Sequence, residues 1–216
     1  KYSTATGATA ASTCMDCEVG KYYEGTGAPL ASSCTDCGAG KYSTATGATS
    51  SSACKSCKAG KYSDAAGSSA CTDCPTGKYS TAIGARSASS CTDCAPGKYS
   101  TTLGSSSAST CELCPAGKYY DGSGAAACKD CPAGKYYDSM GAASVSACKN
   151  CTAGKYFDGT GAVSISACKD CAAGKYSAGT GATSVSTCEA CEAGKVSRVG
   201  ESECTSACPS GTYYSA

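Results

Sequence analysis

The chain has 216 residues with 18 basic and 17 acidic side chains, so its net charge of +1 gives no reason to expect a nucleic-acid partner. Most of its 41% hydrophobic fraction is Ala, Cys and Tyr, and only 14 residues are Leu, Ile, Val, Met, Phe or Trp. These numbers exclude a conventional hydrophobic core, because so few large apolar side chains cannot offset the chain entropy lost on folding.

Cysteine is the residue that stands out, with 22 copies in the chain. That density is typical of a disulfide scaffold, and disulfides persist in oxidising compartments. We therefore expect a secreted protein, in an extracellular or cell-surface location. The sequence contains no apolar run long enough to span a membrane and no export signal, which suggests a mature or partial chain without a membrane span in this segment.

A repeat with a period of about 20 residues organises the sequence. Each unit reads C-x2-C-x2-G-K-Y, followed by a Gly six residues after the Lys. Nine copies keep Gly-Lys-Tyr intact, from residues 20–22 to residues 174–176, and the tenth has Val196 in place of Tyr. We therefore predict one array over residues 1–216, made of about eleven Cys-rich repeats of 16–20 residues with partial repeats at both ends.

Each unit is predicted to form a small β-hairpin. A short strand runs through Lys-Tyr, a glycine such as Gly27 makes the turn, and a return strand leads to a Cys-x-x-Cys corner. The return strand is inferred from small or apolar residues alternating with Ser over residues 163–167 and at Val185 and Ser186. The predicted fold class is small disulfide-rich repeats forming an elongated, all-β, solenoid-like rod with little hydrophobic core.

The eleven Cys pairs are compatible with three arrangements. Bonds inside each C-x2-C are one, and zinc held between pairs is another, since C-x2-C-x16-C-x2-C is a zinc-ribbon spacing, although the chain has no His. The third joins the second Cys of one pair to the first Cys of the next, with Cys14 and Cys208 unpaired in this segment. Its bonds are Cys17 with Cys34, Cys37 with Cys54, Cys57 with Cys71, Cys74 with Cys91, Cys94 with Cys111, Cys114 with Cys128, Cys131 with Cys148, Cys151 with Cys168, Cys171 with Cys188 and Cys191 with Cys204.

The repeat resembles two known modules. One is the single-disulfide module that opens tumour necrosis factor receptor cysteine-rich domains, and the closer one is the ephrin-receptor-like cysteine-rich repeat. The resemblance covers nearly the whole chain and implies a bond from the Cys before Gly-x-Tyr to the next Cys downstream, as in the third arrangement. Only the final unit departs from the pattern, at Val196, at Gly200 and in the wider spacing of Cys204 and Cys208. The residues that carry the resemblance are Cys17, Gly20, Lys21, Tyr22, Gly27 and Cys34.

The tyrosine of each unit is expected to cover the neighbouring disulfide, and a ligand-binding strip is the alternative. In four units a second aromatic residue follows, and we expect its ring on the opposite strand face. These second rings are our candidates for lateral contact between chains: Tyr23, Tyr120, Tyr137 and Phe157.

The Lys of Gly-Lys-Tyr recurs along the chain, and an Asp lies inside many of the Cys pairs. We expect these charges to be solvated, with weak surface ion pairs and calcium binding by the Asp row as the alternatives. Asn150, Cys151 and Thr152 form an N-x-[ST] triplet, so Asn150 is a candidate N-glycosylation site, although a disulfide at Cys151 would hinder the transferase.

Catalysis finds no support, because the chain has no His, no Gly-x-Ser-x-Gly and no phosphate loop. We expect no enzyme activity, cofactor or metal. Mild variation between units favours a structural glycoprotein, a segment of an extracellular filament, fibril or cell-surface appendage, over the alternative, a stalk or ligand-binding ectodomain of a receptor or adhesion protein. The expected partners are other copies or neighbouring filament subunits, with glycans as a further candidate.

Overall fold

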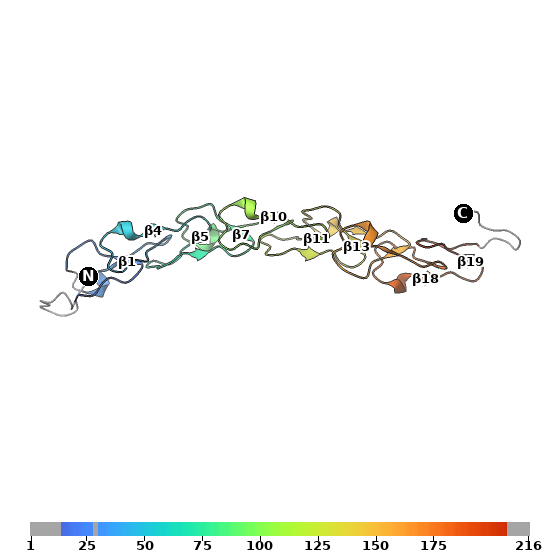
Figure 1. Cartoon of the computed structure of the whole chain (residues 1–216), viewed down its shortest axis with the longest axis horizontal. Coiled ribbons are helices and arrows are strands. Elements are labelled where there is room, and N and C mark those ends of the chain that lie inside the picture. The colour runs from blue at the N-terminus through green and yellow to red at the C-terminus, as the bar shows by residue number, and fades with distance from the viewer. Residues whose placement is uncertain (1–13, 28–29, 207–216) are drawn as a thin grey trace. The chain divides into compact units, whose positions relative to one another are not determined.

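The computed structural model describes residues 14–27 and 30–206. Every regular element in these residues is two or three residues long, and none is an α-helix (Figure 1). The predicted class of short antiparallel hairpins with tandem disulfides and little hydrophobic core is confirmed.

Ten repeats lie in the described residues, each running from the second Cys of one pair through the two residues that follow the first Cys of the next pair. Repeats 1 to 10 begin at Cys17, Cys37, Cys57, Cys74, Cys94, Cys114, Cys131, Cys151, Cys171 and Cys191. The strands at Gly-Lys-Tyr are β1 (Lys21–Tyr22), β3 (Lys41–Tyr42), β5 (Lys61–Tyr62), β7 (Lys78–Tyr79), β9 (Lys98–Tyr99), β11 (Lys118–Tyr119), β13 (Lys135–Tyr136), β15 (Lys155–Tyr156), β17 (Lys175–Tyr176) and β19 (Lys195–Val196). The return strands are β2 (Thr35–Asp36), β4 (Lys55–Ser56), β6 (Thr72–Asp73), β8 (Thr92–Asp93), β10 (Glu112–Leu113), β12 (Lys129–Asp130), β14 (Lys149–Asn150), β16 (Lys169–Asp170), β18 (Glu189–Ala190) and β20 (Thr205–Ser206). The 3-10 turns are η2 (Ala31–Ser33), η3 (Ser51–Ala53), η4 (Ala88–Ser90), η5 (Ala108–Thr110), η6 (Val145–Ala147), η7 (Ile165–Ala167) and η8 (Val185–Thr187).

The prediction of a return strand over residues 163–167, and another at Val185 and Ser186, is wrong. Residues 165–167 form the turn η7, Val185 and Ser186 belong to the turn η8, and the return strand is only the two residues inside the Cys pair. In η7 the Ser164 hydroxyl accepts a hydrogen bond from the Ser166 amide at 3.0 Å, so this serine caps the turn. The Ser alternation therefore reflects local capping and not a strand period. Repeats 3 and 6, whose bonded Cys are only 14 positions apart, contain no such turn.

Each hairpin has a fixed register, which places the Lys of Gly-Lys-Tyr opposite the residue just before the next repeat. In repeat 1, Lys21 pairs with Asp36 and Tyr22 with Thr35. In repeat 8, Lys155 pairs with Asp170 in the same way. A strand pair this short is marginal by itself, so its register must be stabilised by other contacts.

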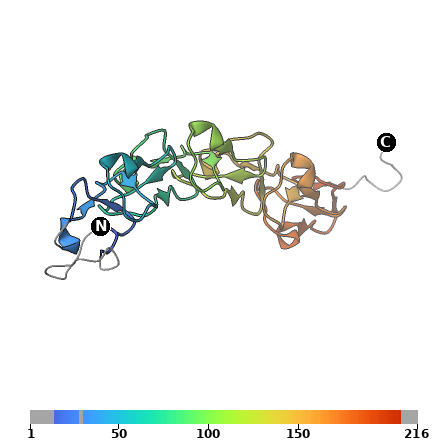
Figure 2. The same ribbon diagram turned by 60° about the vertical axis from the view of Figure 1, so that its left-hand side comes forward.

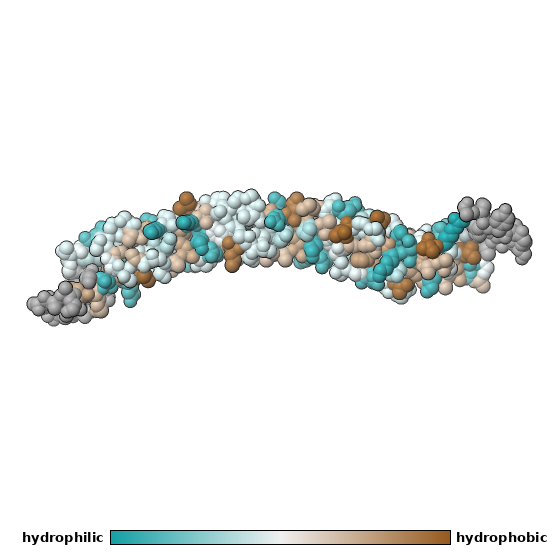
Figure 3. All heavy atoms as spheres, viewed as in Figure 1, coloured by the Kyte–Doolittle hydropathy of each residue, from teal (hydrophilic) through white to brown (hydrophobic). Residues whose placement is uncertain are grey.

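Cystine sulfur and small side chains form the buried interior. The Cys that opens each of repeats 1 to 9 is at most 1% exposed, and the larger apolar side chains lie mainly on the surface. Figure 3 shows these as separate brown patches on a mostly pale face. Several closing Cys are buried as well, and so are these small Ala and Ser residues: Ala85, Ala125, Ala142, Ala162, Ser43, Ser63, Ser80, Ser100, Ser105 and Ser177.

Three backbone hydrogen bonds join each repeat to the next. Between repeats 7 and 8, the amides of Gly134, Tyr137 and Gly161 donate to the carbonyls of Phe157, Ala162 and Cys131, at 2.8, 2.9 and 2.8 Å. The same three bonds recur along the chain. They supply the interface between neighbours that a tandem array needs.

The described residues form two compact units. Unit 1 contains residues 14–27, 30–94, 100–112 and 124–126, and unit 2 contains residues 95–99, 113–123 and 127–206. Within each unit, consecutive repeats lie side by side in chain order, as the colour gradient shows in both views (Figures 1 and 2). Repeats two places apart also lie close together, because a Cβ built on Gly117 would overlap the Gly161 carbonyl oxygen.

Candidate functional site

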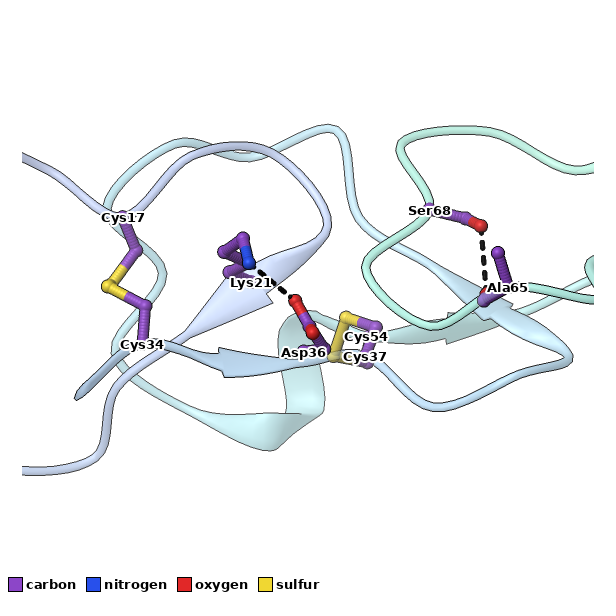
Figure 4. Close-up of polar contacts among 8 residues, drawn as sticks. All are labelled: Cys17, Lys21, Cys34, Asp36, Cys37, Cys54, Ala65 and Ser68. Carbon is purple, nitrogen blue, oxygen red and sulfur yellow. Dashed lines mark hydrogen bonds and ion pairs between the residues drawn. A yellow bond between two sulfur atoms is a disulfide. The ribbon is translucent and has the colours of Figure 1, made fainter. Parts of the chain in front are cut away.

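Ten disulfides cross-link the described residues, and each closes one repeat. They link Cys17 to Cys34, Cys37 to Cys54, Cys57 to Cys71, Cys74 to Cys91, Cys94 to Cys111, Cys114 to Cys128, Cys131 to Cys148, Cys151 to Cys168, Cys171 to Cys188 and Cys191 to Cys204. The first two are drawn in Figure 4. Oxidised sulfur is not a thiolate, so these cysteines do not provide zinc ligands. Cys14 is free, and Cys208 lies outside the described residues.

The recurring Lys and Asp residues form ion pairs across the hairpins, where the sequence had favoured solvated charges. Lys21 Nζ lies 2.7 Å from Asp36 Oδ1 (Figure 4), and this hydrogen bond raises the pKa of Lys21. Both side chains are about a third or more exposed, so each such pair contributes at most about 1 kcal/mol. The equivalent pairs are Lys61 with Asp73, Lys78 with Asp93, Lys118 with Asp130 and Lys155 with Asp170.

Asn150 takes the place of this Asp in repeat 7. Its Oδ1 accepts a hydrogen bond from Lys135 at 2.6 Å, and its Nδ2 donates to Thr180 Oγ1 in repeat 9 at 3.2 Å. The next residue, Cys151, is fully buried in its disulfide. Both ends of the amide are therefore engaged in contacts within unit 2, and glycosylation of Asn150 stays a prediction.

The second aromatic residues stand where five other repeats have a buried Ser. Each of the four rings is half-buried. In three of them the ring folds over a glycine two residues later: a Cβ at Gly25 would lie 2.7 Å from the Tyr23 hydroxyl, and one at Gly159 would lie 2.9 Å from Phe157 Cζ. Gly122 is covered by Tyr120 in the same way. These rings are partly used within their own repeat, and their part in lateral contacts stays a prediction.

Repeats 6, 7 and 8 each carry a cluster of one Lys, one aromatic ring and one Asp, which we did not single out from the sequence. In repeat 6, the Lys129 ammonium lies 5.2 Å from the Tyr120 ring centroid and 3.1 Å from Asp121 Oδ1. The sequence signals were an acidic residue directly after the doubled aromatics and a Lys directly after the closing Cys. In repeats 7 and 8 the ring is instead the tyrosine of Gly-Lys-Tyr: Lys149 lies over Tyr136 and pairs with Asp138, and Lys169 lies over Tyr156 and pairs with Asp158.

These clusters predict how stability depends on pH. Hydrogen bonds from Lys lower the pKa of Asp121, Asp138 and Asp158 below 3.8 and raise the pKa of the three Lys above 10.5. A lowered Asp pKa stabilises the fold above pH 3.8, and this is lost as the pH falls further; the raised Lys pKa stabilises it below pH 10.5, and this is lost as the pH rises further. Because the chain has no His, we expect a constant melting temperature across the neutral range, and a drop below pH 3.8 and above pH 10.5.

The matched control for that pH profile replaces the three cluster lysines, as Lys129→Met, Lys149→Met and Lys169→Met together. This variant should lose less stability than the natural chain between pH 4.5 and pH 2.5, measured by thermal melts under non-reducing conditions. Identical acid profiles for the two proteins would contradict the assignment.

Repeat 9 differs from the three repeats before it. Glu189 stands where they have Lys, and the Tyr176 hydroxyl donates a hydrogen bond to Glu189 Oε2 at 3.0 Å, which raises the pKa of Tyr176. Beside this pair is an open depression of about 360 Å³. Its lining residues are Tyr176, Ser177, Ala178, Gly179, Thr180, Ala182, Thr187 and Glu189.

The fold and these contacts define a disulfide-laddered tandem-repeat protein, stabilised by covalent loops and short backbone ladders. Residues 50–91 and 101–148 match the family model described as tyrosine-protein kinase ephrin type A/B receptor-like. These two stretches carry ephrin-receptor-like cysteine-rich repeats. No curated protein matches the chain.

The described part of the chain contains no helix with the length and apolar character needed to cross a membrane. Repeats of this kind, with ten disulfides, are those of an extracellular domain, and they point to an extracellular or cell-surface location.

Proposed function

We propose that this chain is a non-catalytic structural segment of an extracellular filament or cell-surface appendage. The observation that carries the proposal is the repeated junction: three backbone hydrogen bonds link each repeat to the next, and a disulfide closes each repeat. Because these contacts are local, repeats can be added without changing the environment of the others. Such an array suits a protein that must extend over a long distance.

Side-to-side association would use the second aromatic rings. They are half-buried, so each presents part of an apolar face to a neighbouring chain. Repeats 2, 3, 4, 5 and 9 have a buried Ser at the same position, which shows that the backbone there accepts either residue. A ring-free variant should therefore fold.

Electron microscopy and non-reducing mass analysis of the full chain test this proposal. We expect concentration-dependent lateral assemblies, and we expect them to disappear in the fourfold variant Tyr23→Ser, Tyr120→Ser, Tyr137→Ser and Phe157→Ser. The matched control replaces exposed apolar residues elsewhere, as Ile83→Ser and Leu103→Ser, and should still assemble. Monomers at every concentration would contradict the proposal.

A stalk or ligand-binding ectodomain is the second candidate. The observation in its favour is that the Lys, aromatic and Asp clusters occur in three consecutive repeats of unit 2, beside the depression in repeat 9. Binding modules concentrate unusual aromatic and charged residues in a few places. Specific capture of a ligand by a monomeric chain would favour this candidate.

A further inference from the structure

Repeat 9 contains an empty version of a seat that three other repeats fill with an aromatic ring. We define the ring seat as the surface above the glycine eight residues after the opening Cys. Repeats 1, 6 and 8 cover this glycine with a ring from two residues earlier. In repeat 9 the residue two positions earlier is Ser177, and a Cβ built at Gly179 would meet no atom within 4 Å.

The seat in repeat 9 is open and has the size for a ring. Ser177 is 6% exposed, so its short side chain is turned inward and leaves Gly179 uncovered. The depression of about 360 Å³ includes Gly179, and the Tyr176 side chain lines it. A ring placed there would contact the glycine backbone below it and an aromatic side chain beside it, an arrangement that aromatic pairs favour.

The charge of this seat is also different. In repeats 6 to 8, an Asp follows the second aromatic residue and a Lys follows the closing Cys, so each cluster is neutral. In repeat 9, Ala178 replaces the Asp and Glu189 replaces the Lys. The seat therefore lacks both the ring and the cation found in repeat 6, and it offers a carboxylate in their place.

We propose that repeat 9 binds an aromatic side chain with a basic group beside it, presented by a partner polypeptide. The ring would lie on Gly179 as Tyr120 lies on Gly122, and the basic group would pair with Glu189. A cation beside a ring next to a carboxylate is the combination that the chain itself builds from Lys129, Tyr120 and Asp121. The site exists whether or not the chain forms filaments.

Nuclear magnetic resonance of the full chain tests this site, with tyramine as the probe because it carries a phenol ring and an ammonium group. A ring on Gly179 shifts its Hα resonances upfield, and Gly25, Gly122 and Gly159 provide the internal reference. We expect a saturable upfield shift at Gly179 with tyramine, and binding at least tenfold weaker for 4-methylphenol, which has the ring without the cation. A blocked Lys-Tyr dipeptide should produce the same shift, and a blocked Lys-Ala dipeptide should not.

Three variants locate the binding. Ser177→Tyr should fill the seat with the chain's own ring, as in repeat 6, shifting Gly179 without any probe and abolishing binding. Gly179→Ala places a methyl group in open space, so the repeat should fold, but the methyl group occupies the position of the ring and should abolish binding. Glu189→Lys should retain 4-methylphenol binding and reduce tyramine binding to the same level.

Three results would overturn the proposal. The first is no shift with tyramine or the Lys-Tyr dipeptide, and the second is an unchanged tyramine response in Ser177→Tyr. The third is a Gly179 resonance already shifted in the free chain, because a ring of the same chain would then fill the seat. A response to a neutral oligosaccharide such as chitohexaose, with none to the Lys-Tyr dipeptide, would assign the seat to a glycan and overturn it as well.

Discussion

Removing the disulfide of repeat 7, as Cys131→Ala with Cys148→Ala, is expected to open that repeat locally. The two sulfurs are buried at 0% and 2% exposure and form the centre of the repeat. A loop of this size, with the bonded Cys 17 positions apart, contributes about 3 kcal/mol by restricting the unfolded chain. Two-residue strands cannot replace that stabilisation.

Native-state hydrogen exchange measures this effect at single amides. The Gly161 amide donates to the Cys131 carbonyl, and the Tyr137 amide donates to Ala162, so both report on the junction of repeats 7 and 8. We expect their exchange to accelerate roughly a hundredfold, the rate equivalent of about 3 kcal/mol. The Gly40 amide, which donates to Ser63 in unit 1, is the control and should keep its rate, because coupling in repeat arrays acts between neighbours.

Two other outcomes would contradict this account. Equal loss of protection at Gly40 and Gly161 would mean that the chain opens as one cooperative block, and the repeats would not be independent. Unchanged protection at Gly161 would mean that the backbone bonds hold the repeat without its disulfide.

The fold class could be predicted from the sequence because the spacing of Cys, Gly and Tyr repeats so regularly. Identical units imply identical bonds, so the offset of the connection could be expressed as a single rule for the whole chain. The pairing of Lys21 with Asp36 was harder to choose, because charge alternation alone does not distinguish an ion pair from two solvated groups.

The return strand was misassigned because two physical causes give the same pattern. Ser at every second position is expected for a half-buried strand, but Ser164 and Ser184 instead accept hydrogen bonds from the amides two residues later. Short polar turns are set by such local bonds, which a hydrophobic period does not detect.

The ring seat could not be predicted from the residues of repeat 9 alone. The seat is recognised by comparing repeats of the same chain: Gly25, Gly122 and Gly159 lie under rings, while Gly179 does not. The sequence shows the glycines, but only the structure shows that the ring folds back over its own turn. Once that geometry is known, the absence of a ring over Gly179 can be recognised.

The contact between repeats two places apart predicts a large effect for Gly117→Ala. Gly117 has φ of +78°, and a Cβ there would overlap the Gly161 carbonyl oxygen and approach Val163 Cγ1 to 3.2 Å. Gly174 has the same φ of +78° but no atom within 4 Å of its Cβ position, so Gly174→Ala is the matched control. Both variants pay about 1 to 2 kcal/mol for the left-handed backbone, and Gly117→Ala adds about 1 to 3 kcal/mol for the clash.

Guanidinium denaturation of the oxidised chain separates the two contributions, with exchange at the Gly117 amide, which donates to Tyr137, as the local readout. We expect Gly117→Ala to lower the free energy of unfolding of its region by about 2 to 5 kcal/mol, and Gly174→Ala by about 1 to 2 kcal/mol. Equal losses would show that only the backbone angle requires glycine. Unequal losses in the expected order would show that repeats two apart support each other, so that an array gains stability beyond what each neighbouring junction provides.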